Sequence, residues 1–520
     1  MSVLKGNSAA ALYGSQASNG VILITTKKGK TSQGLKVELN SNYVFEEAIN
    51  HLDPQKEYGS GLLGQKPSTQ TEAWDAGEFS WGAKLDGSSV VQFDGVSRPY
   101  SYSGDNFDRF YRTGSTFTNT VSLSGGTTDV GYRFSASNME NESVMPNSGM
   151  KRQTFSVNLH GKALDDKLSF QTSAQYILQD VNNRSQLADS PGNAHYSVWQ
   201  LPVTTNVLDL RGDPNRLGAN AEDATDLYGA TMGQKGYELL PTSSIWFQNP
   251  YWAAYQQTDK DSKDRVIASA TLQYDVNDWV FVKGRAGIDQ SDRITEGISP
   301  TGTGHNVNGG MSQGQNKYQQ TNFDIMLGSS HEFDNGLGYD FLVGANKMRL
   351  QEDWTSASGS NFALPFYYSI ANGINNRGSS SFVKLGSHSV YAQAEISYDN
   401  WLFLTGSARN DWFSVLDGRD VFYPSVGLSG VLTDVLSLPE IIDFLKVRTS
   451  WAQVGGVGDI GAYSLNQNYY LGRAQLGVPR GGISGNTVRN SGLSPLVVTE
   501  LEFGFNVQLL NNRLGLDFSY

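Results

Sequence analysis

Alternation of apolar and polar residues in many short segments constrains the fold of this 520-residue chain more than any other feature. In residues 268–276 every second side chain is apolar, and the same period recurs at 390–399 and 501–509. Shorter versions lie at 155–159 and 168–176. A period of two places the apolar side chains on one face of a β-strand. Because no helical repeat of comparable length occurs, the sequence predicts an all-β protein.

The connections between these predicted strands are of two kinds. Short polar turns are predicted at 127–129, 163–166, 277–278, 334–338, 399–400 and 511–513. Long connections rich in Gly, Ser, Asn and aromatic residues are predicted at 46–115, 181–262, 293–317, 351–384 and 456–494. A globular sandwich seldom contains several connections of this length. Outer-membrane β-barrels combine short periplasmic turns with long extracellular loops, so we expect a transmembrane antiparallel β-barrel.

Aromatic residues beside the tight turns favour the same interpretation. They are Tyr274, Trp279, Phe281, Tyr398, Trp401 and Phe403. Such positions are typical of the aromatic girdle at a membrane interface. The alternative is that they form ordinary cross-strand pairs in a soluble sheet. Their recurrence beside tight turns favours the girdle.

Composition excludes several classes of protein. The chain has 39 Lys and Arg against 51 Asp and Glu, a net charge of −12, so a surface that binds nucleic acid is not expected. It has no cysteine, which excludes disulfides, thiolate metal sites and cysteine nucleophiles. The longest aliphatic run is Val21–Ile24, far short of the roughly 20 apolar residues of a membrane-spanning helix.

The two ends of the sequence suggest a longer protein. Neither a basic nor an apolar leader segment follows Met1, and the strand that begins near Leu514 is still in progress at Tyr520. About 15 strands are predicted, and an unpaired strand edge is not stable in hydrocarbon. The expectation is therefore an incomplete barrel.

Residues 3–29 read VLKGNSAAALYGSQASNGVILITTKKG. This segment resembles the end of the plug domain in SusC/RagA-type TonB-dependent outer-membrane transporters. Further stretches resemble that family in the same order: WGAKLDG at 81–87, DNFDRFYRTGSTFTNTVSLSGG at 105–126, NPYW at 249–252, ARNDWFSVLDGRDVFYPSVGLS at 408–429 and VRTSWAQVGG at 447–456. The resemblance implies a 22-stranded barrel around an internal plug, with residues 1–33 as the end of the plug and 34–520 as part of the barrel.

Within the plug segment, specific residues are expected to fix the backbone. Glycine tolerates turn conformations that other residues avoid, and a continuous apolar run is typical of a strand buried on both faces. Ala9–Ala11 fit a closely packed short helix. The expected turn glycines are Gly6, Gly14 and Gly20, and the expected buried strand is Val21, Ile22, Leu23 and Ile24.

The resemblance also implies a function and partners. It implies import of a glycan or oligopeptide through the outer membrane, with energy transmitted by TonB and its inner-membrane complex through an N-terminal segment outside these residues. A SusD-like surface lipoprotein would cover the mouth, and outer-membrane lipid would surround the barrel. The alternatives are a passive porin-like channel and a surface-binding barrel through which nothing passes.

Enzymatic activity is the weakest alternative, and no cofactor is expected. The sequence contains neither a G-x-S-x-G nor a G-x-x-x-x-G-K-[ST] motif, and its six histidines lack metal-ligand spacing. The G-x-G-x-x-G string Gly59, Gly61, Gly64 has the wrong flanks for a dinucleotide site, and the tripeptide 211–213 is interpreted as a solvated turn. Asn410, Asp411, Asp417 and Asp420 suggest calcium, but a solvated loop is favoured because their spacing is not that of an EF-hand.

Aromatic residues in the long connections are the candidates for contact with a solute. Flat rings stack on the apolar faces of sugars or hold peptide side chains. The competing interpretation is that these rings pack one loop against another. The candidates are Trp199, Trp246, Phe247, Trp252, Trp354, Phe366, Tyr367 and Tyr368.

Overall fold

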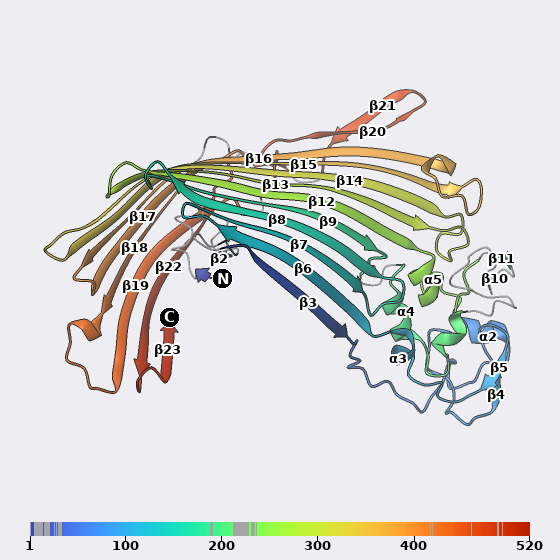
Figure 1. The fold of residues 1–520 in the computed structure, drawn as a ribbon. Helices are drawn as coiled ribbons and strands as arrows, with labels where there is room; N and C mark the ends of the chain where they lie inside the picture. Colours follow the sequence, from blue (N-terminus) through green and yellow to red (C-terminus); the bar gives the residue numbers. More distant parts are fainter. Residues whose placement is uncertain are drawn as a thin grey trace.

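A single antiparallel sheet of fifteen strands dominates the computed structural model (Figure 1). The structure describes residues 2–4, 14, 21–24, 27, 29, 34–187, 191–211, 228–229, 234–235, 237–416, 418, 420–458, 460–485, 488–490 and 492–520. The sheet order is β23-β22-β19-β18-β17-β16-β15-β14-β13-β12-β9-β8-β7-β6-β3, so every strand pairs with its neighbours in the chain. The predicted number of strands is confirmed, and β3 and β23 form the two edges.

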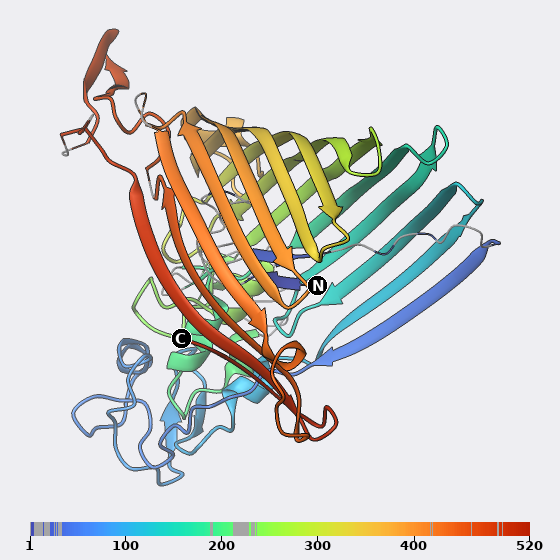
Figure 2. The ribbon, with the colours of Figure 1, turned by 90° about the vertical axis from the view of Figure 1, so that its left-hand side faces the viewer.

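The strands of the sheet lengthen toward its middle. Their bounds are β3 Lys36–Glu46, β6 Gly114–Gly126, β7 Val130–Glu142, β8 Gly149–Ala163, β9 Leu168–Asn182, β12 Thr258–Asp275, β13 Val280–Ser299, β14 Gly310–Glu332, β15 Leu337–Phe362, β16 Gly373–Tyr398, β17 Leu402–Phe413, β18 Asp420–Val431, β19 Ile442–Gly456, β22 Leu496–Leu509 and β23 Leu514–Ser519. A hairpin of β20 (Tyr469–Gln475) and β21 (Val478–Ile483) projects beyond the sheet (Figures 1 and 2).

The predicted tight turns are confirmed at one end of the sheet. At the turn between β16 and β17, Asp399 and Asn400 have φ angles of 45° and 55°. Asp and Asn tolerate this left-handed conformation better than most other residues. The same chemistry recurs at Asn511 and Asn512 between β22 and β23, with φ angles of 57° and 61°.

Two of the predicted long loops are mostly strand. Between β13 and β14 only residues 300–309 form the loop, and between β15 and β16 only 363–372, including η5 (Ile370–Asn372). The predictions of 293–317 and 351–384 were therefore wrong. Both faces of these strand ends carry polar residues, such as Gln315 and Asn316 on β14, so the apolar alternation is lost although the strand continues.

The two faces of the sheet differ in the way the alternation predicts. On the outer, convex face large apolar side chains are exposed, among them Leu272 at 55% and Ile325 at 61%. The inner, concave face carries polar side chains such as Asp324 and Arg409, and β2 (Val21–Leu23) lies on that side in both views (Figures 1 and 2). Exposed apolar residues on one continuous face are expected where lipid replaces water.

The aromatic residues beside the turns divide between the two faces. Tyr274, Trp279 and Tyr398 are 43%, 48% and 47% exposed, as a girdle requires. Phe281 and Phe403 instead share the inner face, where Lys283 and Lys446 lie over their rings at 5.1 and 5.7 Å. The prediction that these two belong to the girdle was wrong. Side chains alternate between the two faces along a strand, and the adjacent residues Val282 and Leu404 face outward. Trp401 is half-buried.

Two long loops fold together into a cap at the other end of the sheet. We define the cap as the described residues of 47–113 and 183–257. It contains α2 (Gln70–Asp75), β4 (Ser89–Val91), β5 (Ser97–Pro99), α3 (Asn106–Phe110), α4 (Ala194–Gln200), η3 (Val207–Arg211), β10 (Tyr228–Gly229), β11 (Gln234–Lys235) and α5 (Pro250–Tyr255). Its helices begin at side-chain caps: the Asn249 side chain accepts from the Tyr251 and Trp252 backbone amides, with Pro250 at the first position.

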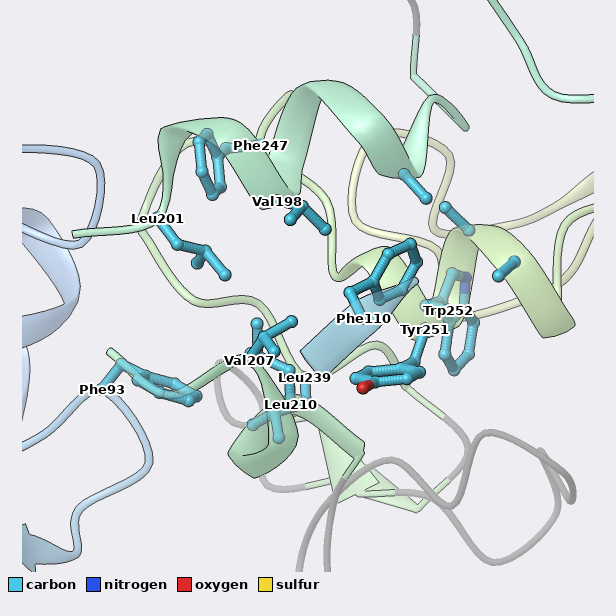
Figure 3. Close-up of a cluster of buried hydrophobic side chains, with 13 residues drawn as sticks. Phe93, Phe110, Val198, Leu201, Val207, Leu210, Leu239, Phe247, Tyr251 and Trp252 are labelled. Carbon is cyan, nitrogen blue, oxygen red and sulfur yellow. The ribbon is translucent and has the colours of Figure 1, made fainter. Parts of the chain in front are cut away.

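A hydrophobic cluster holds the two loops of the cap together (Figure 3). Phe110 from the first loop packs edge-on against Tyr251 from the second, with ring centroids 5.2 Å apart. Trp252 has no exposed surface, and its Nε1 donates to Thr303 Oγ1 at 3.0 Å in the loop between β13 and β14. The cap is thus a small folded unit attached to the sheet.

The N-terminal segment is short in the described residues. β1 (Ser2–Leu4) pairs antiparallel with β2. The predicted strand at residues 21–24 is present, but its predicted burial on both faces is wrong, because Ile22 and Ile24 are 61% and 77% exposed. Among the described residues β1 is the only strand partner of β2. Within the described part of the chain, no helix is long and apolar enough to cross a membrane.

Candidate functional site

A continuous polar network crosses the inner face from β13 to β18. Arg285 Nη2 lies 3.2 Å from Asp324 Oδ2, and the Tyr391 hydroxyl donates to Asp324 Oδ1 at 3.5 Å. The Arg409 guanidinium lies 5.3 Å from the centroid of the Tyr391 ring and donates to Asp411 Oδ1 at 2.7 Å. Charged, hydroxyl and aromatic side chains on neighbouring strands thus form one continuous path along the inner face. We call the fifteen-stranded sheet the wall.

The pair of Arg409 and Asp411 is the buried centre of this network. The two side chains are 6% and 2% exposed, and the Tyr423 hydroxyl also donates to Asp411. Removing one partner of a buried ion pair typically costs about 3–5 kcal/mol, since the other charge stays buried. Arg409 already balances the charge of the Asp411 carboxylate, which argues against a calcium ion at this residue. Asp417 lies outside the described residues.

Gly14 approaches the inner face of the sheet at this buried pair. A Cβ added to Gly14 would lie 3.3 Å from Arg409 Nη2, and Gly14 has a φ of +81°. A larger residue would be strained in conformation and would press on the guanidinium. Gly14 has the positive φ that a turn glycine adopts, while Gly6 and Gly20 lie outside the described residues.

A cavity of about 440 Å³ lies beside this contact. Its lining includes Gly14, Asn346, Arg409, Leu385 and Val454. Asn346 Nδ2 donates to Asp324 Oδ1 at 2.9 Å, which ties the cavity to the polar network. The inner face therefore offers both polar and apolar surface next to the N-terminal segment.

A second cavity, of about 460 Å³, lies where the cap meets the strand ends. Its lining includes the polar residues Arg184, Gln186, Asp259, His305 and Ser358 and apolar residues such as Ile298 and Met311. The amide oxygen of Gln257 and the hydroxyl of Ser299, both in this lining, are buried and have no hydrogen-bond partner among the residues that the structure describes. Buried polar groups are normally satisfied, so such atoms are suited to accept or donate to a polar solute.

Two of the eight candidate aromatic residues cannot contact a solute in this structure. Phe247 and Trp252 are 2% and 0% exposed and belong to the hydrophobic cluster of the cap. The sequence showed only that they lie in a long connection, whereas the structure shows that the connection has a core of its own. For these two residues the packing interpretation is correct.

The other six candidates retain accessible surface. Trp199, Trp246, Tyr367 and Tyr368 are 47%, 59%, 58% and 38% exposed. Trp246 stacks on His305, which lines the second cavity, with centroids 6.1 Å apart. Phe366 is half-buried in the loop between β15 and β16.

Trp354 is the candidate that lies on the wall itself. It lies on β15, opposite Asn316 of β14 and Ser381 of β16, on the same face as Asn346. Its side chain is half-buried, above the polar network and below the loop end of the strand. A solute that entered past the cap would meet this ring before it reached Arg409.

Glu238 is a buried carboxyl in the cap that sequence patterns did not reveal. It is 1% exposed and accepts from the backbone amides of Asn249 and Gly304, both at 2.8 Å. Burial raises the pKa of Glu238 to about 7, and burial also lowers the pKa of His305 below its usual value. Because Gly304 belongs to the loop between β13 and β14, Glu238 fastens the cap to the strands. A lone Glu in a polar loop gives no signal of burial.

The remaining motifs have structural roles. Gly59, Gly61 and Gly64 lie in a loop and open no helix, so the interpretation as loop glycines is confirmed. A Cβ at Gly61 would lie 2.1 Å from the backbone oxygen of Gln65. Arg211 ends η3, and residues 212–213 lie outside the described residues. Among the residues that the structure describes, no group of three or more His, Asp or Glu is placed to hold a metal ion.

The curved sheet, the outward apolar face and the polar inner wall define an outer-membrane β-barrel protein of the receptor type. The family model described as "TonB dependent receptor-like, beta-barrel" matches residues 199–520, and the chain belongs to this family. Members of the family are outer-membrane receptors and transporters rather than a class of enzymes. The resemblance drawn from the motifs is thereby confirmed.

Individual proteins are similar to this chain in sequence or in structure. The TonB-dependent receptor SusC of Bacteroides thetaiotaomicron is 26% identical over 494 residues, which are 89% of this chain and 44% of that protein. The TonB-dependent receptor P3 of Formosa agariphila is 24% identical, over 100% of this chain and 48% of its own. A structure of the RagAB peptide importer in a closed-closed state matches with a TM-score of 0.76 at 18% identity, over 99% of this chain and 57% of that one. This chain thus spans about half the length of the curated relatives.

Proposed function

We propose that the protein containing this chain imports a large polar nutrient, a glycan or an oligopeptide, across the outer membrane with energy supplied through TonB. Family membership and the similarity to SusC support the assignment to import. A SusD-like lipoprotein is the proposed partner at the extracellular mouth. Residues 1–33 are proposed as the end of the plug, and residues 34–520 as part of the barrel.

The observation that carries this proposal is the close approach of Gly14 to Arg409 inside the curve of the sheet. A passive channel needs an open lumen, whereas here Gly14 lies beside the buried ion pair of the sheet. A gate that must be moved needs an energy source. This contact favours energised import over the passive alternative.

The proposed solute path begins at the cap and descends along the inner wall. Trp246 and Trp354 are proposed to stack on the solute, with the cavity at Gln257 and Ser299 as the first polar contact. Hydroxyls, amides and balanced charges suit uncharged sugars or peptides better than a strongly charged solute. No covalent step is proposed.

The test is uptake of labelled oligosaccharide and oligopeptide libraries by cells that carry the full-length protein. Uptake is expected to stop when the membrane potential is collapsed or when TonB is deleted. Uptake that continues unchanged under both treatments would instead support a passive channel, and surface binding without uptake in untreated cells would support a binding barrel.

A second measurement locates the path. Trp246→Ala and Trp354→Ala are each expected to lower uptake about fivefold or more, because each removes a stacking surface. Trp279→Ala, an exposed tryptophan beside a tight turn, is the matched control and should leave uptake unchanged.

A further inference from the structure

Charged residues on the outer face change sign around the sheet. Moving from the tight turns toward the loops, the first outward charged residue above the apolar rows is acidic on four strands. These residues are Glu140 on β7, Asp180 on β9, Asp264 on β12 and Asp292 on β13. On β8 and β14 it is basic, but Lys151 and Lys317 lie directly opposite two of these carboxylates, Glu140 and Asp292. On β15 and β16 the corresponding residues are basic: Lys347, Arg349 and Lys384.

Strand register brings these three cations together. Arg349 lies opposite Gly386, and Lys384 lies two residues from Gly386 on the same face. Lys347 lies two residues from Arg349 along β15. Same-face diagonal neighbours on adjacent strands are about 7–8 Å apart. We call Lys347, Arg349 and Lys384 the basic patch; all three side chains are exposed.

The basic patch is not neutralised within the described part of the chain. None of its residues forms an ion pair there, whereas Lys151 on β8 pairs with Glu140. The outward residues that flank the patch in register are Gln319, Thr321, Gln351, Gly386 and His388, and the carboxylate beside them is Asp353, two residues along β15 from the residue opposite Lys384. The outward carboxylate of Asp353 accepts from Gln351 Nε2 at 2.8 Å. Lys384 Nζ lies 5.5 Å from the centroid of the Phe382 ring, which leaves its positive charge in place. A group of three cations without an ion pair among the described residues, in a chain of net charge −12, suits an anionic ligand.

The position of the patch along the strands, relative to the lipid-facing surface, indicates what that ligand is. Lys347 lies directly opposite Phe323, which is 54% exposed on the outer face. Beyond Arg349 the strand continues to Phe362, about 44 Å of extended chain. The patch therefore lies where the lipid-facing surface ends, far from the loops at which a protein partner would dock.

We propose that the basic patch binds a phosphate group on the headgroup of an outer-leaflet lipid. The planar guanidinium of Arg349 can donate two parallel hydrogen bonds to phosphate oxygens, and the two lysines add point charges on either side. Basic clusters at a membrane surface attract anionic headgroups in this way. The exposed ring of Phe323 supplies apolar surface for the acyl chains of the same lipid. This site does not depend on whether transport is energised.

The test uses the full-length protein in nanodiscs of uncharged lipid, into which a phosphorylated glycolipid or its dephosphorylated form is titrated. The variant Lys347→Gln/Arg349→Gln/Lys384→Gln is compared with Lys151→Gln/Lys260→Gln/Lys317→Gln, which removes the same charge from outward positions elsewhere. Bound lipid is counted by native mass spectrometry. The patch variant is expected to bind the phosphorylated lipid about a hundredfold more weakly, at roughly fivefold per cation.

Several outcomes would overturn the proposal. One is equal loss in the two triple variants; another is equal binding of phosphorylated and dephosphorylated lipid by the wild-type protein. A third is a patch variant that keeps the lipid but loses a co-purified surface lipoprotein, which would assign the patch to a protein partner. If the triple variant fails to fold, Arg349→Gln alone is expected to lose about fivefold, while Arg349→Lys retains most of the binding.

Discussion

The wall and the cap of this protein place their apolar residues in opposite ways. In the wall the large apolar side chains are the exposed ones, such as Ile325 at 61%. In the cap they are buried, and Leu210 and Trp252 have no exposed surface. The two regions are therefore suited to different solvents. In the wall the backbone hydrogen bonds are made within the sheet and the apolar side chains face lipid, whereas the cap buries its apolar side chains away from water.

The largest expected effect is on the cap alone. Trp252→Ala should destabilise the cap by about 3–5 kcal/mol, because it leaves a cavity among fully buried neighbours and removes the hydrogen bond to Thr303. Hydrogen exchange and limited proteolysis should show an opened cap on an intact sheet. Trp246→Ala, at a 59% exposed position, is the control. Loss of protection across the sheet as well would show that the cap and the wall are one cooperative unit.

The next effect tests the wall. Ala270→Lys places a charge on the outer face, midway along the apolar row from Val266 to Tyr274, and should cost about 2–4 kcal/mol in the free energy of unfolding from lipid vesicles. Thr271→Lys, one residue along the strand, faces inward and should cost much less. Equal costs at the two positions would refute the assignment of the faces.

Acidity should distinguish the two regions. The pKa of Glu238 is about 7 in the folded cap against 4.5 in the unfolded chain. The folded cap therefore binds more protons between these pH values, and its stability, fully present below about pH 4.5, is lost as the pH rises through 7. The total change is up to about 3 kcal/mol. Glu238→Gln should remove the contribution of Glu238 to this slope in cap protection.

The smallest effect is expected at an exposed ion pair on the wall. Arg448 Nη2 lies 2.8 Å from Asp517 Oδ1, with side chains 30% and 56% exposed. Arg448→Gln should change the free energy of unfolding by less than about 1 kcal/mol, because water already screens this pair. A double-mutant cycle with Asp517→Asn measures the coupling. A coupling energy of several kcal/mol would mean that this part of the wall is drier than its exposure indicates.

The parts of the fold that could be predicted are those fixed by neighbours in sequence. Alternation located the strands, and Asn and Asp at residues such as 399–400 located the turns. The strand ends beyond the lipid could not be predicted, since residues such as Asn316 lie where both faces are polar. The prediction that Phe281 belongs to the aromatic girdle was wrong for a related reason. The distance of a residue from a turn does not by itself show whether its side chain faces outward or inward.

The candidate site was predictable only in part, because long-range packing decides which aromatic residues are accessible. Phe110 and Tyr251 come from different loops, and no local sequence pattern indicates that these loops pack into one hydrophobic core. Trp246 and Phe247 are adjacent in sequence, yet one is exposed and the other buried. The network of Arg409, Asp411 and Tyr423 likewise depends on strand register rather than on spacing in sequence.

The length of the central strands has a consequence for how far from the cell a solute is first met. β15 has 26 residues, about 88 Å of extended chain. With a barrel tilt of about 40°, this corresponds to a height of about 65 Å, whereas the apolar band is only about 25 Å tall. The loop ends of the central strands therefore stand some 40 Å beyond the apolar band. If the protein imports a nutrient as proposed, that nutrient is met within the polysaccharide coat around the bacterium and need not diffuse through the whole coat first.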